Sequence, residues 1–364
     1  MRRSTTPLLF GAMFLATSFL ACTTQAPQAE SFSWWTFQKI HEANPCLMPG
    51  DALFDCPIRG ETIAWEAKDV FNPAAVVREG KVYMIYRAED TVGKYAGTSR
   101  LGLAISDDGM TFRKEALPVF FPDNDSLKKY EWEGGVEDPR IVETPEGEYV
   151  MTYTAYDGVV ARLLVATSPD LRTWTKHGLA FGEGKYRDLW SKSGAILCEQ
   201  SEERLVARRI NGKYWMYFGD KQLHIATSTD LIHWAIKEDS VGKPAAVMSY
   251  RKGKFDSDLV EPGPPALFTP QGILLIYNGR NYGPDQDPTI QTGTYSAGQA
   301  LFALTQPDSL INRMEEPFFW PEADYEIEGQ VNRVVFVQGL VPFQGKWFLY
   351  YGTADSKIGV AKRD

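Results

Sequence analysis

The stretch EGEYVMTYTAYDG at residues 146–158 decides the fold of this chain, because it recurs. It joins a Gly-containing turn to an alternating strand centred on a tyrosine, and related phrases stand at 79–89, 211–220, 271–279 and 344–355. The tyrosines at the matching place are Tyr86, Tyr153, Tyr217, Tyr277 and Tyr350, at intervals of 60 to 73 residues. Self-similarity of this kind predicts a repeat architecture.

A second phrase follows most copies, as in LLVATSPDLRTW at residues 163–174. It alternates apolar residues, turns at Ser/Thr-x-Asp and ends on an aromatic residue, which is typical of short strands and tight turns. Each unit therefore reads as about four antiparallel strands. Five such sheets set radially predict an all-β chain with a five-bladed β-propeller. A β-sandwich or two separate β domains would not give regular recurrence from about residue 70 to 364.

Composition agrees with a turn-rich β protein and excludes other classes. The 364 residues carry 38 Lys and Arg against 47 Asp and Glu, and the net charge of -9 argues against an extended nucleic-acid surface. Hydrophobic content of 44% is too high for a disordered chain. Beyond the N-terminal segment, no run of 18 uninterrupted apolar residues predicts a membrane span.

The N-terminus is predicted to be a targeting segment. A basic Met-Arg-Arg start precedes mostly apolar residues 7–21, and FLAC at 19–22 resembles a bacterial lipobox. We expect residues 1–21 to be a lipoprotein signal peptide, Cys22 to be lipidated, and 22–30 to be a flexible tether. The alternative is an ordinary secretory signal with an incidental cysteine. Either reading predicts export, and the lipoprotein reading predicts the bacterial cell envelope, in the periplasm or at the outer membrane.

The folded body is then expected over residues 31–364, with 31–69 as a lead-in that packs on the propeller or supplies its closing strand. Within the lead-in, Cys46 and Cys56 are candidates for a disulfide in an exported protein, and two free thiols are the alternative. The four histidines show no ligand spacing with the cysteines, so no metal site and no cofactor are expected.

The propeller topology predicts where chemistry would gather. The first strand of each blade lines the axis, and the second returns to the face where the first began. One mouth of the axis would therefore collect charged residues, amides and aromatics, which are costly there unless paired or functional. These residues are Asn72, Arg87, Asp138, Tyr156, Asp157, Lys192, Asp220, Glu261, Asn278 and Asp355. Such a set suits a sugar, and cleaving a glycosidic bond needs a proton donor and, for inversion, a base.

Several of these residues stand in motifs that resemble glycoside hydrolase family 130. The motifs are FNPAAV (71–76), MIYRAED (84–90), GGVEDPRIV (134–142), MTYTAYDG (151–158), EPGPPAL (261–267) and YYGTADSKIGVA (350–361). The resemblance covers roughly residues 65–364. It implies a five-bladed propeller acting on mannosides, either as a phosphorylase or as a β-1,2-mannosidase. It also implies that Asn72, Arg87 and Asp355 hold the terminal mannose, and that Asp138 is the general acid of the phosphorylases, acting through a substrate hydroxyl.

The resemblance further bears on what attacks the sugar. Phosphorylases hold phosphate with basic residues, including a His-Arg-Pro type motif where this chain reads Phe218-Gly219-Asp220. A carboxylate there would repel phosphate. The family's hydrolases carry an acid at that place and a second in VEPGPP, which implies Asp220 as base and Glu261 as acid, although Asp is one methylene shorter than the Glu of the hydrolases. Either Glu261 or Asp138 would deliver the proton.

Together with the carboxylate pattern, the resemblance implies an exo-acting, inverting glycosidase that releases mannose from β-mannosides, above all from β-1,2-linked ones. Tyr156, Asp157, Lys192 and Asn278 are further candidate substrate contacts, and Arg140 is expected to orient Asp138. Export favours hydrolysis, because a sugar phosphate released outside the cytoplasm would have to be imported. The alternatives are a phosphorylase producing mannose 1-phosphate and a glycan-binding propeller without turnover. The expected partners are an oligosaccharide and, through the lipid anchor only, a membrane, with no nucleic acid.

Overall fold

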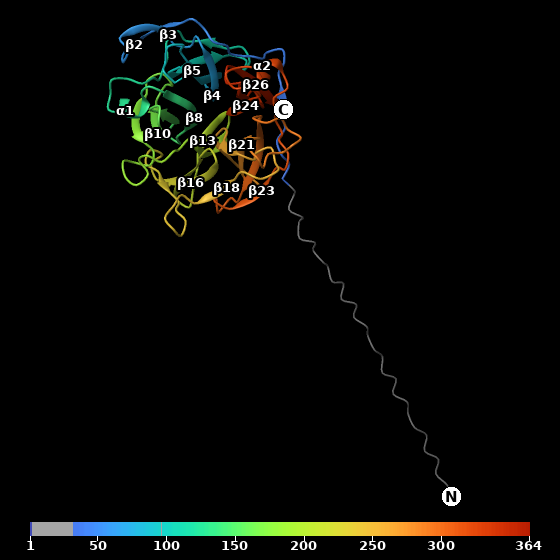
Figure 1. Cartoon of the computed structure of the whole chain (residues 1–364). Helices are drawn as coiled ribbons and strands as arrows, with labels where there is room; N and C mark the ends of the chain where they lie inside the picture. The colour runs from blue at the N-terminus through green and yellow to red at the C-terminus, as the bar shows by residue number, and fades with distance from the viewer. Residues whose placement is uncertain (2–31, 96) are drawn as a thin grey trace. The chain divides into compact units, whose positions relative to one another are not determined.

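The strands that carry the repeated tyrosines form antiparallel meanders in the computed structural model, which describes residue 1 and residues 32–364 except 96 (Figure 1). The expected signal peptide and tether, with Cys22, lie outside the described residues. Residues Trp34–Asp364 form one compact unit. The prediction of an all-β chain is confirmed, since the described helices are only two short turns, α1 (Lys128–Glu131) and α2 (Asp324–Ile327).

The elements fall into groups that follow the sequence repeats. The first meander contains β4 (Asp69–Arg78), β5 (Lys81–Glu89), β6 (Ser99–Ser106) and β7 (Arg113–Lys114). The second contains β8 (Gly135–Glu143), β9 (Tyr149–Tyr156), β10 (Ala161–Ser168) and β11 (Thr175–Leu179). The third contains β12 (Ala195–Ser201), β13 (Arg204–Ala207), β14 (Arg209–Ile210), β15 (Lys213–Phe218), β16 (Gln222–Ser228), β17 (Ala235–Ile236) and β18 (Ala246–Ser249). The fourth contains β19 (Leu259–Pro262), β20 (Ala266–Thr269), β21 (Gly272–Arg280), β22 (Tyr295–Phe302) and β23 (Leu310–Arg313). The last contains β24 (Val335–Phe343), β25 (Lys346–Thr353) and β26 (Lys357–Arg363).

Neighbouring meanders touch through short parallel contacts. Ser99 of β6 pairs with Gly135 of β8, and a bridge joins Tyr295 of β22 to Val334, just before β24. The third meander departs from the repeat, because β12 and β13 form an extra hairpin whose strands pair in parallel with β20 and β8. In Figure 1 the labels of β4, β8, β13, β21 and β24 lie toward the middle of the folded body, and those of β16, β18 and β23 lie at its rim.

The lead-in supplies an outer strand to the last meander. Strand β1 (Gln38–Lys39) pairs antiparallel with β26, with Gln38 opposite Lys362. A hairpin of β2 (Leu53–Cys56) and β3 (Glu61–Ala64) follows, and Trp65 behind it is fully buried against the first meander. Cys46 and Cys56 are both free thiols, so the second of the two readings of this cysteine pair is the one observed.

The repeated tyrosines explain why the phrase recurs. All five are fully buried in the strand next to the innermost one, namely Tyr86, Tyr153, Tyr217, Tyr277 and Tyr350. A buried phenol must find a hydrogen-bond acceptor. The acceptors are the carboxylates of Glu66, Glu131 and Asp256 for Tyr86, Tyr153 and Tyr277, and the main-chain oxygens of Pro307 and Gly109 for Tyr217 and Tyr350.

The Ser-x-Asp turns of the second phrase are closed by their own side chains. In one of them, the Ser168 hydroxyl accepts from the Leu171 N–H at 2.8 Å, and the Asp170 carboxylate accepts from the Thr173 N–H at 2.7 Å. The same pattern recurs at Ser106 and Ser228. Side-chain acceptors of this kind make a turn independent of the rest of the sheet.

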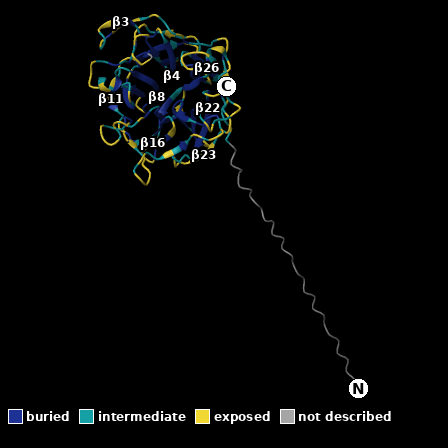
Figure 2. Cartoon of the chain, in the orientation of Figure 1, coloured by how far each residue is buried: buried dark blue, intermediate teal, exposed yellow. Residues whose placement is uncertain are grey.

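The buried residues follow the strands and the exposed ones the loops at the rim (Figure 2). Strands β4, β8 and β24, which are innermost in their meanders, are buried along almost their whole length. Within the described part of the chain, no helix is long and apolar enough to cross a membrane.

The tyrosine contacts lead to a stability prediction. Replacing Tyr153 with Phe leaves the buried Glu131 carboxylate without a donor that lies 2.9 Å away, so we expect Y153F to lower the free energy of unfolding by about 1–2 kcal/mol. Urea denaturation measures this. The exposed Tyr250 provides the control, Y250F. Equal unfolding midpoints for the two variants would contradict the role given to the repeated phenols.

Candidate active site

A polar cavity of about 140 Å³ lies where the innermost strands begin. It contains six of the residues that the sequence singled out, Asn72, Arg87, Asp138, Lys192, Glu261 and Asp355. The other lining residues are Phe71, Tyr295, Gln330, Val334 and Phe336. Each of the five meanders, or the segment next to it, thus contributes a charged side chain to this one small cavity.

Backbone bulges aim several of these side chains. The pairing of β4 with β5 shifts between Phe71 and Ala74, and that of β8 with β9 shifts between Glu137 and Arg140. The residues inside the two shifts, Asn72 and Asp138, have φ of 46° and 49°. A non-glycine residue with positive φ is uncommon, and Asn and Asp tolerate it best. The Asn-Pro and Asp-Pro motifs therefore mark matching bulges that re-aim a side chain.

Asp138 is held as a carboxylate. Its Oδ1 accepts from Asn72 Nδ2 at 3.0 Å and from Arg87 Nη1 at 3.2 Å, and its Oδ2 lies 3.6 Å from Lys192 Nζ. Burial works to raise the pKa of Asp138, but the charges of Arg87 and Lys192 and the Asn72 hydrogen bond outweigh it and hold the pKa well below its usual range. Asp138 is thus a hydrogen-bond acceptor rather than a ready proton donor.

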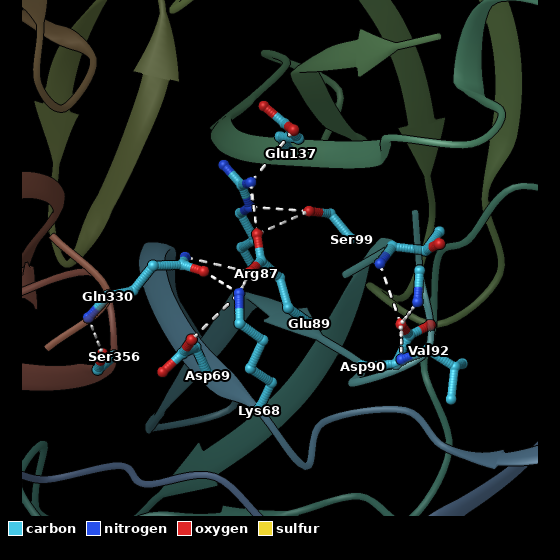
Figure 3. A network of polar contacts seen from close by, with 12 residues as sticks. Lys68, Asp69, Arg87, Glu89, Asp90, Val92, Ser99, Glu137, Gln330 and Ser356 are labelled. Carbon is cyan, nitrogen blue, oxygen red and sulfur yellow. Dashed lines mark hydrogen bonds and ion pairs between the residues drawn. The ribbon is translucent and has the colours of Figure 1, made fainter. Parts of the chain in front are cut away.

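Arg87 is fixed by carboxylates on several sides (Figure 3). Its Nη2 donates to Glu89 at 2.7 Å and to Glu137 at 3.1 Å, and its Nε donates to Ser99 at 2.9 Å. Although burial opposes it, the charges of Glu137, Glu89 and Asp138 raise the pKa of Arg87. The guanidinium is therefore pre-oriented, with its charge already matched.

The same network reaches a loop that lines the cavity. Glu89 accepts from Lys68 Nζ at 3.0 Å and from Gln330 Nε2 at 3.1 Å, and Lys68 also donates to Gln330 (Figure 3). The main-chain N–H of Gln330 donates to Ser356 Oγ at 2.9 Å. Gln330 is therefore pinned over the cavity, although the sequence analysis did not single it out.

Arg140 clamps two innermost strands together, as its expected orienting role requires. Its Nη1 donates to the Asp138 main-chain oxygen at 3.1 Å, and its Nε and Nη2 donate to the oxygens of Gly263 and Pro262 at 2.7 and 2.5 Å. Arg140 is 2% exposed, and burial lowers its pKa to about 10. This one side chain fixes the strand of Asp138 relative to the strand of Glu261.

Glu261 is buried at the end of β19 and has the opposite tendency to Asp138. Burial raises the pKa of Glu261, and the charges of Lys192 and Arg140 only partly offset it. Ser193 donates to Glu261 Oε1. The charges of Glu261, Asp138 and Glu137 in turn overcome burial and raise the pKa of Lys192. Of the two candidate donors, Glu261 is the one whose surroundings favour the protonated form.

Asp355 faces the sugar-sized space from the last meander. It has a positive φ of 49°, and burial raises its pKa to about 7, with Arg87 opposing the shift. Next to it, Gly352 is required, because a Cβ there would lie 2.4 Å from Asn72 Oδ1. That Asn72 oxygen is buried and has no hydrogen-bond partner among the residues that the structure describes. An unpaired buried acceptor in a cavity points to a ligand hydroxyl.

Asp220 is not one of the cavity-lining residues, but its charge affects Glu261, which is. It is half-buried in the turn after β15, and its Oδ2 accepts from Trp190 Nε1 at 2.7 Å. The neighbouring Gly219 N–H donates to the Lys192 main-chain oxygen at 2.9 Å. The charge of Asp220 also raises the pKa of Glu261. The two acids proposed from the sequence are thus electrostatically coupled.

Three predicted contacts have other structural partners. Asp157 accepts from the Val159 and Val160 N–H groups and pairs with Arg162 at 2.6 Å, so it closes a turn. The Asn278 side-chain amide donates to the Val337 main-chain oxygen and accepts from the Val337 N–H. Tyr156 packs against Tyr95 and Trp190 beside the cavity. None of the three is among the cavity-lining residues.

Tyr295 is the most informative residue that the sequence analysis missed. Its hydroxyl accepts from Arg280 Nη1 at 3.1 Å, and burial raises its pKa to about 12. It lies at the start of β22, directly after the loop 280–293. No repeated phrase marks this position, so only the position after a long loop could have drawn attention to it.

The arrangement suits recognition and cleavage of a sugar. It offers a fixed anion, a buried carboxyl that favours its proton, a cation pair and an unpaired amide oxygen. Among the described residues, no group of three or more His, Cys, Asp or Glu side chains is placed to hold a metal ion. A larger cavity of about 570 Å³ near Trp320 is mostly apolar and contains none of the predicted residues.

Comparisons with known proteins agree with the motifs. The model of glycoside hydrolase family 130, described as β-1,4-mannooligosaccharide phosphorylase, matches residues 48–364. The β-1,2-mannobiose phosphorylase of Thermoanaerobacter sp. strain X514 is 32% identical over 82% of this chain and 90% of its own length. A glycosyl hydrolase structure from Bacteroides ovatus is 48% identical, with a TM-score of 0.88 over 90% of this chain and 93% of that one. A structure from work on GH130 glycoside hydrolases that target β-1,2-mannosidic linkages in Candida mannan is 46% identical, with a TM-score of 0.89 over 92% and 96%.

Asp355 gives a pH-dependent prediction. Because its folded-state pKa is raised to about 7, its contribution to stability is present at low pH and is lost as the pH rises toward and through 7. We expect D355N to gain about 4 kcal/mol of unfolding free energy relative to wild type between pH 4 and pH 8. Urea denaturation at both pH values measures this, with D51N at an exposed position as control. A gain that does not change with pH would contradict the burial effect.

Arg140 gives a second prediction. A lysine keeps the charge but cannot reproduce three hydrogen bonds from one planar fork. We therefore expect R140K to lose about 2–4 kcal/mol of stability and at least ten-fold in kcat. The exposed Arg113 gives the matched control, R113K. If R140K keeps both the stability and the kcat of R113K, the clamp is not needed.

Proposed function

Because the chain belongs to glycoside hydrolase family 130, which acts on β-mannosides, we propose that it is an exo-acting glycosidase that releases mannose from β-1,2-linked mannosides by an inverting mechanism. The observation that carries the proposal is the charge balance of the cavity. Its two cations, Arg87 and Lys192, are already matched by carboxylates, and the charge of an additional acid, Asp220, acts on the cavity residue Glu261. An inorganic phosphate dianion would meet repulsion there, whereas water would not.

The proposed mechanism uses the two coupled acids. Glu261, whose buried position favours the proton, delivers it to the leaving oxygen. Asp220 takes a proton from the attacking water. Inversion requires the two carboxyl groups to lie roughly 6.5–9.5 Å apart, with room for that water.

The remaining cavity residues hold the terminal mannose in this proposal. The unpaired Asn72 oxygen accepts a hydroxyl, Arg87 donates, and Asp355 in its protonated form below about pH 7 donates as well. Asp138, fixed as an anion by Arg87 and Lys192, accepts from a sugar hydroxyl. An oriented acceptor of this kind positions the ring for attack without itself giving up a proton.

Phosphorolysis is the second candidate, because the curated relatives with 32% identity are named phosphorylases. The solved structures with 44–48% identity are named as glycosidases or glycoside hydrolases, and these higher identities support hydrolysis. A glycan-binding propeller without turnover is disfavoured by a buried carboxyl poised to donate a proton.

Two further expectations belong to this proposal. The described meanders and their five buried tyrosines support an arrangement as five blades around an axis. The N-terminal sequence supports export as a lipoprotein, where hydrolysis is more useful than a charged sugar phosphate. The accompanying partners are an oligosaccharide and the membrane through the lipid anchor.

One assay tests the activity. The full-length protein is incubated with β-1,2- and β-1,4-mannobiose, with and without phosphate, and the products are resolved by anomer using NMR. We expect phosphate-independent release of α-mannose from the β-1,2-linked substrate. We also expect E261Q to lower kcat on mannobiose by about 10²-fold or more, and less on an aryl mannoside with a good leaving group.

Two outcomes would overturn the proposal. Mannose 1-phosphate formed only when phosphate is present would establish the phosphorylase. Binding of mannobiose without any turnover would establish a glycan-binding protein.

A further inference from the structure

The indole of Trp190 is the direct partner of the carboxylate at position 220. Trp190 Nε1 donates to Asp220 Oδ2 at 2.7 Å, while half of the Trp190 side chain is exposed. A tryptophan N–H can only donate, and here it engages Oδ2 of Asp220. The other oxygen, Oδ1, remains available to accept a proton. An exposed, unrestrained aspartate could turn either oxygen toward the cavity, and this hydrogen bond removes that freedom.

Buried contacts anchor the loop that presents Trp190. Arg162 donates to Asp188 Oδ1 at 2.8 Å and to the Arg187 main-chain oxygen at 3.2 Å. Ser191 is 2% exposed, its N–H donates to the Ala161 oxygen at 3.0 Å, and its Oγ accepts from Leu163 N–H at 3.0 Å. Asp188, two residues before Trp190, and Ser191, directly after it, are thus tied to β10. The indole is held by the fold rather than left free on the surface.

The anchored segment also connects to the cavity from the other side. Lys192 follows Ser191 directly and lines the cavity, and its main-chain oxygen accepts from Gly219 N–H, next to Asp220. Trp190, Lys192 and Asp220 are therefore joined in a closed loop of contacts. Gly219 is required there, because a Cβ would lie 2.1 Å from the Gln222 oxygen.

Two more aromatic rings continue the surface of the indole. Tyr156 lies edge-on to Trp190 with 6.5 Å between centroids, and Tyr95 lies 6.0 Å from Tyr156. Tyr95 is 37% exposed and Trp190 50% exposed. Exposed aromatic faces beside a polar cavity suit the apolar face of a pyranose ring. This row, Tyr95–Tyr156–Trp190, ends at the indole that is hydrogen-bonded to Asp220.

We propose that Trp190 is a positioning residue for the water-activating carboxylate Asp220 and that its exposed face, with Tyr156 and Tyr95, forms the surface on which the leaving saccharide lies. This inference rests on the proposed hydrolytic function. It also accounts for the shorter aspartate. A carboxylate one methylene shorter than glutamate reaches less far, and a fixed donor compensates by holding one oxygen and so directing the other toward the water.

Two substitutions separate the two roles of Trp190. W190F keeps an aromatic face and removes the donor, so kcat on β-1,2-mannobiose should fall about ten-fold while KM stays within about two-fold. W190A removes the ring as well, so KM should rise several-fold in addition.

The control is W320F, since Trp320 is similarly exposed and lines the separate, larger cavity. Thermal unfolding midpoints of all variants show whether any loss reflects folding, and a fall in kcat at unchanged KM is a readout that a purely structural role would not produce. If W190F has the kcat and KM of W320F, the positioning role is overturned. If the wild type shows no phosphate-independent turnover, the proposed function itself fails, which is a distinguishable result.

Discussion

The geometry of the candidate active site depends on the hydrogen bonds that the Arg140 guanidinium donates to main-chain oxygens. The guanidinium lies among main-chain oxygens of two innermost strands, and none of the carboxylates that the structure describes is within ion-pair distance, so hydrogen bonds rather than an ion pair hold it in place. Gln338 makes a similar bridge from another strand, donating to the oxygens of Asn72 and Pro139 at 2.7 Å each. Bulged strands leave main-chain oxygens unpaired, and these two side chains satisfy them. The bulges that aim Asn72 and Asp138 are thus stabilised by Arg140 and Gln338.

Two buried carboxyl groups in one cavity are driven in opposite directions by their neighbours. Asp138 has two cations and an amide beside it, whereas Glu261 has a hydroxyl donor and cations whose effect does not overcome burial. Pairs of acids whose environments push their pKa values apart are a mark of acid–base catalysis. Asp355 experiences both influences: burial raises its pKa, as for Glu261, and the nearby Arg87 opposes the shift, as for Asp138. The cavity therefore combines one carboxyl group that is held as an anion with two whose pKa is raised by burial.

The repeat predicted the all-β fold and most of the cavity, because strand alternation and topology determine which strand ends meet. Asn72, Arg87, Asp138, Lys192, Glu261 and Asp355 were found in this way, since each was expected near the start of a first strand or the end of a second strand of a repeat unit. Asn278 also ends such a strand, but its amide is used by Val337, a matter of side-chain direction that no strand pattern reveals. Trp190, Tyr295 and Gln330 lie in or beside loops without a repeat, so only tertiary contacts place them near the cavity. The extra β12–β13 hairpin was likewise invisible to a periodic reading.

The five buried phenols carry a consequence for how such a chain can change. The strands that hold them are alike, but their acceptors come from unlike places, such as the lead-in for Tyr86, the short helix α1 for Tyr153 and the segment before β7 for Tyr350. A unit copied into another position would bring its tyrosine without the partner that satisfies it. The strands of one unit could therefore replace those of another, but the connecting segments could not. A connecting loop can be lengthened or replaced only if it still places an acceptor oxygen within hydrogen-bond distance of the tyrosine hydroxyl.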